Sequence, residues 1–164
     1  METLFIPSKH PYQFGDCVEQ TDNPHGYRLK RNVAVCLHSR AYDGLHGNGY
    51  RVSEGWMYAD KGVWWNGSSV VKDLQSCLLA SLVHDLLCDA INHSHLSRWR
   101  RWRLRRAADG LYAAICHWQG MWSGRAYIRY IGLRLFGMPY KAVSSLWQRD
   151  TQHDTKGNEG DGRT

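Results

Sequence analysis

The chain of 164 residues has the length of one domain, and its hydrophobic fraction of 43% is enough for a packed core, which excludes wholesale disorder. Its formal net charge of +6 at pH 7 favours anionic partners, namely nucleic acid, phospholipid headgroups or an acidic protein surface. The five cysteines include no Cys-x-x-Cys pair, which argues against a dense disulfide framework and a structural zinc site.

The first part of the chain predicts short strands separated by loops. Residues 1–26 hold three of the four prolines and little periodicity, which indicates an irregular N-terminal arm or short edge elements. A strand is expected over Tyr27–Leu37, where apolar residues alternate, and a second over Tyr50–Tyr58. The glycine-containing segments Tyr42–Tyr50 and Asp60–Ser69 are expected to be loops.

The second part predicts helices. From about Leu74 apolar residues recur at three and four positions, which is typical of an amphipathic helix, here reaching Ile91. A second helix is expected over Ser97–Trp118 with Ser97 as its N-cap, and a third over Ser123–Phe136. Tyr140–Trp147 predicts a short final helix. On the third helix we expect the shared apolar face to be formed by Ile128, Ile131 and Leu135.

Strands that precede helices predict an α+β fold, with short N-terminal strands and loops followed by about three packed helices. We expect one globular domain over residues 27–148 and a disordered tail over 149–164, where the composition turns polar and glycine-rich. Residues 1–12 show no secretion signal. No uncharged apolar run reaches the roughly 18 residues that a transmembrane helix needs.

Three polar residues on the first two predicted helices could form a catalytic site. His84 and Asp85 lie at opposite edges of the apolar stripe of the first helix, where a His can act as a general base and an Asp can bind a cation. If the two helices pack antiparallel, Asp109 could reach His84 and fix its tautomer. The alternatives are a His-Asp pair that only solvates a helix edge, and an Asp109 that pairs with Arg105 or Arg106.

Five short motifs occur in one order between residues 50 and 137. They read YRVSEGW from Tyr50, NGSSV formed by Asn66, Gly67, Ser68, Ser69 and Val70, ASLVHDLL from Ala80, ADGLY from Ala108 and GLRLFG from Gly132. The set resembles the phage and prophage domain-of-unknown-function family numbered 1353. That family shows a Val-Pro-x-Gly-Phe strand end, an Asp-Gly-Ala-Ser-Ile-Pro loop, a Val-His-Asp helix, an Ala-Asp helix and a closing Arg-Leu-Phe-Gly.

This resemblance implies a bacteriophage origin and a place in the host cytoplasm or the virion. The chain departs from the family at three points, because Asn66 replaces the loop Asp, the loop Pro is replaced by Val71 or absent, and Ser53 replaces the strand-end Pro. If the loop Asp takes part in chemistry in relatives, that chemistry is weakened here.

The His-Asp pair is also similar, more loosely, to that of secreted and bacterial phospholipases A2. In those enzymes the His activates water, the adjacent Asp binds calcium and a later Asp orients the His. The similarity implies that His84 is the base, Asp85 a calcium ligand and Asp109 the orienting group. Carbonyl ligands would come from Asp60–Ser69 or Tyr42–Tyr50, although neither segment matches the usual calcium loop, and the flanking cysteines of those enzymes are missing.

The start of the second predicted helix is strongly basic and aromatic. Arginine binds phosphate through paired hydrogen bonds, and tryptophan inserts at membrane interfaces or stacks on single-stranded bases. The alternative is a solvated helix start whose tryptophans pack on the core. Six cations at a helix N-terminus oppose the helix dipole, which favours an anionic partner. The residues are Arg98, Trp99, Arg100, Arg101, Trp102, Arg103, Arg105 and Arg106.

These patterns support two hypotheses. The first is a small phage-encoded hydrolase with a His84–Asp109 dyad and Asp85 as a cation ligand, acting on an ester of an anionic amphiphile. The second is a non-enzymatic phage accessory or virion protein that uses its basic helix to bind a membrane, nucleic acid or a protein partner such as a phage structural protein. Replacing His84 should abolish turnover in the first case and do little in the second.

Overall fold

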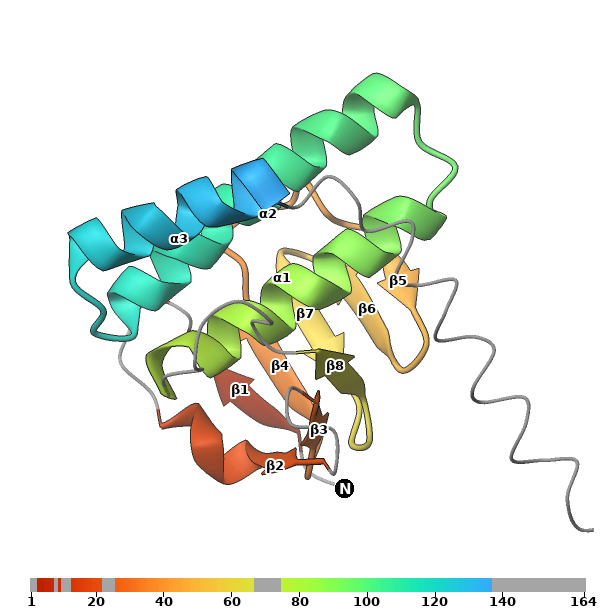
Figure 1. Ribbon diagram of the computed structural model, residues 1–164. Coiled ribbons are helices and arrows are strands. Elements are labelled where there is room, and N and C mark those ends of the chain that lie inside the picture. Colours follow the sequence, from red (N-terminus) through yellow and green to blue (C-terminus); the bar gives the residue numbers. More distant parts are fainter. Residues whose placement is uncertain (1–2, 8, 10–12, 22–25, 67–74, 137–164) are drawn as a thin grey trace, which may run out of the picture.

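The computed structural model describes residues 3–7, 9, 13–21, 26–66 and 75–136 (Figure 1). Within these ranges, strands in the N-terminal half precede three helices, so the fold is α+β as expected. The helices are α1 (Gln75–His93), α2 (Arg98–Trp118) and α3 (Ser123–Phe136). The helix expected over Tyr140–Trp147 and the tail expected over 149–164 lie outside the described residues.

The strands form two sheets. The larger has the order β1-β4-β7-β6-β5, in which β1 runs parallel to β4 and the other neighbours are antiparallel. Its members are β1 (Leu4–Ile6), β4 (Val33–Cys36), β5 (His46–Gly47), β6 (Tyr50–Ser53) and β7 (Trp56–Ala59). The smaller is antiparallel and consists of β2 (Val18–Gln20), β3 (Gly26–Leu29) and β8 (Trp64–Asn66), in the order β2-β3-β8.

The single strand expected over Tyr27–Leu37 is wrong, because the chain changes sheet within it. β3 ends at Leu29 in the smaller sheet, and β4 begins at Val33 in the larger one. Val33, Ala34 and Val35 are all fully buried. β4 is therefore covered on both faces, so its residues do not follow the alternation of a half-exposed strand.

The strand expected over Tyr50–Tyr58 is a hairpin of β6 and β7. Glu54 and Gly55 form its two-residue turn, and both have positive φ angles, 53° and 76°. A hairpin turn of this kind usually contains Asn-Gly or Asp-Gly. The Glu-Gly pair therefore did not indicate a turn in the sequence. The two expected loops around it contain the short strands β5 and β8.

The N-terminal segment contributes to the packed domain. β1 and β2 are edge strands of their sheets, and the 3-10 helix η1 (Phe14–Cys17) lies between them in sequence. Ile6, Phe14 and Cys17 are buried in the same core as the helices. The described part of this segment is thus short edge elements that close the core.

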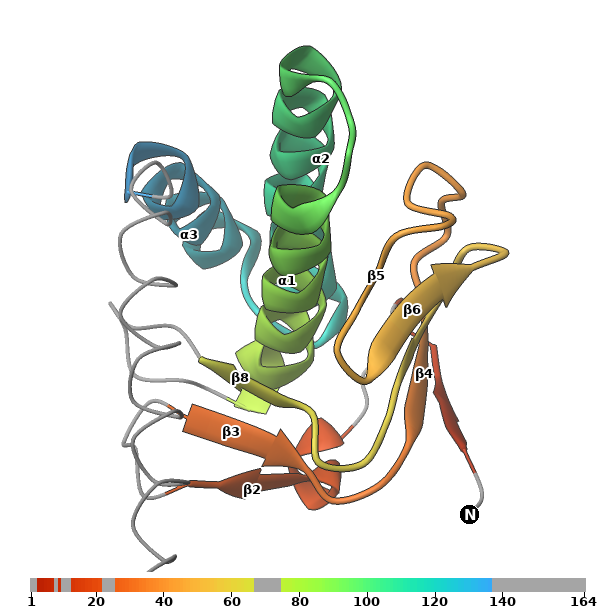
Figure 2. The same ribbon diagram turned by 90° about the vertical axis from the view of Figure 1, so that its right-hand side faces the viewer.

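The three helices stack in layers on the sheets. α1 contacts η1, β5 and β8, α2 runs antiparallel along α1, and α3 packs on α2 (Figure 1). Ser97 caps α2 as expected, since its side chain accepts a hydrogen bond from the Arg100 N–H. The end of the α1–α2 hairpin projects beyond both sheets (Figure 2). None of the helices in the described ranges is long and apolar enough to cross a membrane.

The apolar face expected on α3 is exposed where the structure describes it. Ile128 is 69% exposed and Ile131 is also exposed, whereas Ala126 and Arg129 are buried; the side chain of Leu135 lies outside the described residues. Arg129 points inward because its guanidinium donates a hydrogen bond to the Tyr112 hydroxyl on α2, at 3.0 Å. The buried face of α3 is therefore offset from its most hydrophobic face.

Candidate functional site

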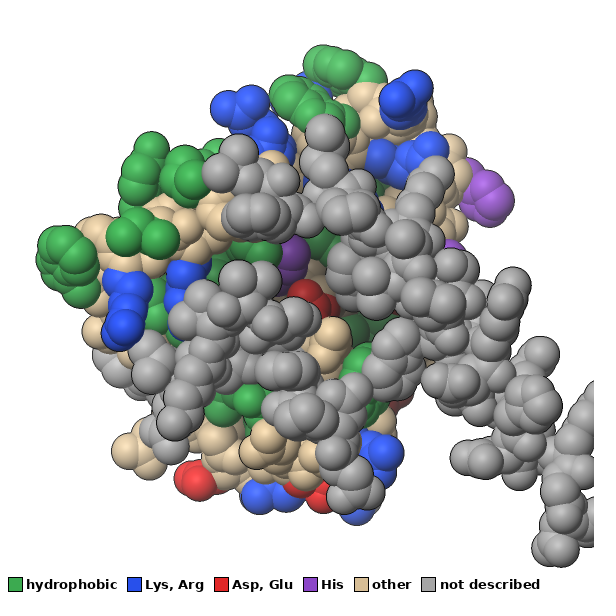
Figure 3. Space-filling model, viewed as in Figure 1, with side chains coloured by type: hydrophobic (Ala, Val, Ile, Leu, Met, Phe, Trp, Pro, Cys, Tyr) green, Lys and Arg blue, Asp and Glu red, His purple; other side chains and the backbone are tan. Residues whose placement is uncertain are grey.

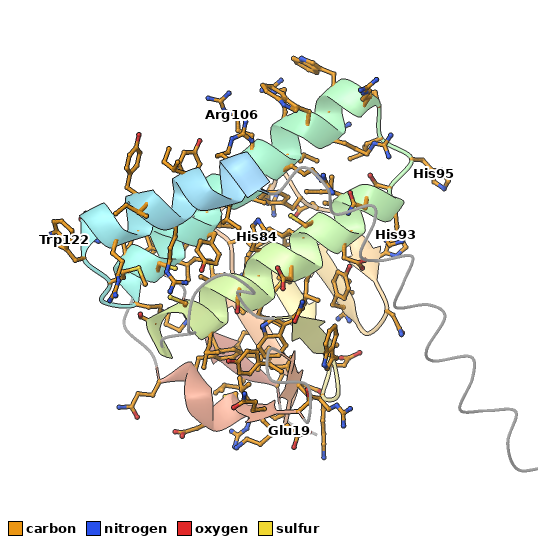
Figure 4. All side chains as sticks on the ribbon, viewed as in Figure 1. Glu19, His84, His93, His95, Arg106 and Trp122 are labelled. Atoms are coloured by element: carbon orange, nitrogen blue, oxygen red, sulfur yellow. The ribbon has the colours of Figure 1, made fainter. Side chains whose placement is uncertain are left out.

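α1 places His84 and Asp85 at the edges of its buried face. The neighbouring Leu82, Val83 and Leu86 are buried, so the helix has little freedom to rotate. The side chains of His84 and Asp85 are 13% and 20% exposed, which confirms the expected boundary position. Figure 4 shows His84 between α1 and the layer formed by α2 and α3.

The imidazole of His84 lies between two carboxylates. Its Nε2 is 3.0 Å from Oδ1 of Asp109 on α2, and its Nδ1 is 3.3 Å from Oδ1 of Asp85. The antiparallel packing of α1 and α2 thus brings Asp109 to His84 as expected. The side chain of Asp109 is only 11% exposed, so this contact is largely shielded from water.

Two residues that sequence reasoning missed complete the arrangement. Nη1 of Arg134 on α3 donates to Oδ2 of Asp109 at 3.2 Å, and Sγ of Cys88 lies 3.6 Å from Nε2 of His84. Signals existed for both, because Arg134 belongs to the GLRLFG motif and Cys88 follows His84 by one helical turn. The His84 cluster consists of His84, Asp85, Cys88, Asp109 and Arg134.

The His84 cluster favours the protonated form of its histidine. Burial by itself lowers the pKa of His84, but the charge interaction with Cys88 and the hydrogen bonds with Asp109, Asp85 and Cys88 outweigh it. The net result is a pKa well above the ordinary value of 6.5. Positive and negative groups then alternate from Asp85 through His84 and Asp109 to Arg134, which is the arrangement expected of a satisfied ionic network.

A cleft of about 540 Å³ borders the His84 cluster on the side of Asp85. One wall comes from α1, through Asp85 and Asp89, and the opposite wall from the strands, through Tyr50 and Trp64. The Tyr50 hydroxyl donates to Oδ2 of Asp89 at 2.5 Å, which joins the two walls at one end. Of the predicted loop residues, Asn66 lines this cleft, and the other three lie outside the described residues: Gly67, Ser68 and Ser69.

The described residues show no cluster of side chains of the kind that holds a metal ion. Within them, no group of three or more His, Cys, Asp or Glu side chains is placed to hold a metal ion. Asp85, the expected ligand, directs Oδ1 to His84. In the loop at 42–50, Oδ1 of Asp43 accepts the Gly55 N–H at 2.9 Å and so serves the β6–β7 turn.

The basic start of α2 contributes no residue to the His84 cluster, although its last two arginines, Arg105 and Arg106, precede Asp109 by only four and three residues. Arg98 precedes Asp109 by eleven residues, about 16 Å along the helix. Trp99 and Trp102 are exposed, so they do not pack on the core, and each ring is covered by a guanidinium. The structure brings Arg134, and none of the six predicted arginines, to Asp109.

Comparison with known proteins gives no relative. No protein-family model matches the chain, and no curated protein or solved structure matches it significantly. The resemblances to the phage family and to phospholipases A2 therefore depend on the motifs alone.

Proposed function

We propose that the protein is a hydrolase of carboxylic esters in which His84 is the general base and Asp109 orients it. The observation that carries this proposal is the 3.0 Å contact between Nε2 of His84 and Oδ1 of Asp109, formed across two helices in a largely shielded place. A carboxylate on one imidazole nitrogen fixes the tautomer and makes the other nitrogen the site of proton transfer.

Nδ1 is the nitrogen that would exchange a proton with substrate. Its contact with Asp85, at 3.3 Å, is the longer of the two and exceeds the usual length of an N–H···O hydrogen bond. Asp85 also lines the cleft, so rotation of its side chain away from His84 would open a path from the cleft to Nδ1. In the proposed reaction Nδ1 takes a proton from water, the hydroxide attacks the ester carbonyl, and the proton passes to the leaving alkoxide.

The raised pKa of His84 sets the expected pH dependence of this reaction. At neutral pH the imidazole carries its proton and cannot act as a base. Turnover should therefore rise with pH as His84 loses the proton. This rise should occur at a higher pH than the one at which an ordinary histidine loses its proton. We assign no step to calcium, and it enters only as a condition of the test.

The test measures fatty-acid release from anionic phospholipid vesicles by the purified protein between pH 6 and pH 10. Each point is taken with calcium and with chelator, for the native chain, His84→Gln and Asp109→Asn. We expect release that increases with pH, is lost in His84→Gln, and is reduced in Asp109→Asn with its pH midpoint moved to lower values. Absence of release from the folded native protein under all conditions would overturn the proposal.

A structural role is the competing explanation of the His84 cluster, since an ionic network can simply join α1, α2 and α3. The two roles separate when activity and unfolding are measured on the same variants. Arg134→Gln removes one hydrogen bond to Asp109 and leaves the contact of Asp109 with His84 intact. If the cluster is only structural, Arg134→Gln and His84→Gln should both lower the free energy of unfolding. In that case neither the native chain nor the variants should release fatty acid.

A non-enzymatic binding function is favoured by a separate observation. Among the described residues, no carboxylate forms an ion pair with any of the six arginines at the start of α2. Cations left without carboxylate partners there are suited to an anionic ligand. This function does not need the His84 cluster, so the two proposals can hold together or separately.

A further inference from the structure

The positive charge of the protein is concentrated on its outer helical layer. α2 carries six arginines and α3 carries three, while the sole acidic residue of the two helices is Asp109, which points inward. The complete chain has 21 Lys and Arg against 15 Asp and Glu. Without these two helices the rest of the chain would have more acidic than basic residues, so α2 and α3 account for the whole net charge.

The same layer exposes large hydrophobic side chains. Trp122 at the start of α3 is 76% exposed, Ile128 is 69% exposed, and Trp99 on α2 is 64% exposed. Hydrophobic and basic side chains follow one another along the edge that α2 and α3 form away from the sheets (Figure 3). We use the name outer face for the exposed aromatic, aliphatic and basic side chains of this layer, which are Trp99, Trp102, Trp122, Tyr127, Ile128 and Ile131 with Arg98, Arg100, Arg103, Arg106 and Arg125.

We infer that the outer face docks the protein on the surface of a membrane rich in anionic lipid. Tryptophan and tyrosine rings suit the headgroup level, exposed isoleucines suit the acyl boundary, and arginines pair with lipid phosphates. None of these residues belongs to the His84 cluster, so the inference goes beyond the proposed hydrolase and does not depend on it.

The composition of the outer face favours lipid over nucleic acid. Single-stranded nucleic acid binds through aromatic rings on which bases stack. Here Arg103 lies over the ring of Trp99 at 4.6 Å and Arg106 over that of Trp102 at 5.6 Å, so one face of each ring is already occupied. Ile128 and Ile131 give no stacking surface, but they gain from transfer into hydrocarbon.

Cosedimentation with vesicles tests the inference on the complete chain. The vesicles are phosphatidylcholine alone or phosphatidylcholine with phosphatidylglycerol, at low and high salt. The variants are Arg100→Glu with Arg103→Glu for charge and Ile128→Asp for the apolar part. The matched control is Arg31→Glu with Arg51→Glu, which makes the same charge change at two exposed positions away from the helices, one in the loop between β3 and β4 and one on β6.

We expect binding to the anionic vesicles and not to phosphatidylcholine alone, weakened by salt. The α2 double variant should bind about thirtyfold or more weakly, since each arginine near an anionic surface changes the affinity about fivefold. Ile128→Asp should bind about tenfold more weakly, as expected for one aliphatic side chain that no longer enters hydrocarbon. The affinity of the control variant for anionic vesicles should fall clearly less than that of the α2 double variant.

Three results would overturn the inference. Failure of the native chain to bind anionic vesicles is the first, and tight binding to single-stranded DNA in the same salt would then assign the arginines to nucleic acid. Equal losses in the α2 variant and the control would show attraction by net charge without a defined face. Unchanged binding of Ile128→Asp, with circular dichroism showing native helix content, would remove α3 from the interface.

Discussion

Replacing Asp109 by Asn should destabilise the protein strongly, and more at pH 6 than at pH 9. The substitution keeps the shape of the side chain but leaves His84 and Arg134 without the carboxylate between them. Breaking a largely buried charge pair in this way costs about 3 kcal/mol or more. That is a large part of the roughly 5–15 kcal/mol by which a domain is stable.

The pH dependence follows from the direction of the His84 pKa shift. The pKa of His84 in the folded protein lies above its ordinary value of 6.5, so the folded state binds the proton more tightly than the unfolded state. The stabilisation from this proton is fully present below about pH 6.5 and is lost as the pH rises through the folded pKa. Replacing Asp109 removes part of this stabilisation. The difference in the free energy of unfolding between the native chain and Asp109→Asn should therefore be smaller at high pH.

Urea unfolding at pH 6 and pH 9 measures both effects, with Asp60→Asn as an exposed control that should change stability by about 0.5 kcal/mol or less. The double variant with His84→Gln isolates the coupling between the two residues. Part of the lost stability comes from the broken contact between Asp109 and Arg134. This part should not depend on pH between 6 and 9, because an arginine stays charged throughout this range. An equal loss at both pH values would refute a charged His84, and a loss under about 1 kcal/mol would refute the buried contact itself.

Three further predictions concern the frame that holds the His84 cluster, and each is measured by denaturant unfolding. Ser97→Ala should lower the free energy of unfolding by about 1 kcal/mol, because it removes the cap that accepts the Arg100 N–H; an unchanged value would contradict the cap. Glu54→Asn should raise it by about 0.5–1 kcal/mol, since asparagine tolerates the positive φ of the β6–β7 turn better; a decrease would contradict that turn geometry. Leu79→Ala should lower it by about 2–5 kcal/mol because the side chain is fully buried, and a loss below 1 kcal/mol would be inconsistent with its place in the core.

The helices were predictable from the sequence because each has a long run of regular spacing and clear ends. The expected bounds of the second and third helices agree with α2 and α3 to within a residue. The strands were not predictable in the same way, because each has four residues or fewer and the sequence lacks two of the usual signals of strands and hairpins. β4 is buried on both faces, and the turn at Glu54 and Gly55 lacks the usual residue pair.

One part of the candidate site could be predicted from the sequence and another part could not. The contact of His84 with Asp109 was predictable, because both lie on regular helices whose buried faces can be read from spacing. Arg134 was not predicted, because its contact with Asp109 depends on how α3 crosses α2, and the expected apolar face of α3 pointed elsewhere. Periodicity identifies the most hydrophobic face of a helix, whereas here a buried arginine and small residues mark the face that packs.

The order of elements has a consequence for folding during synthesis. All the described strands lie before residue 67, and α1, which covers both sheets, ends at His93. Strand residues such as Leu29, Val35 and Met57 share one core with Leu79 and Leu82 of α1, so their apolar surface stays open until that helix has left the ribosome. We therefore expect nascent chains that stop before α1 to aggregate or to bind chaperones, and chains that extend through α2 to become resistant to protease.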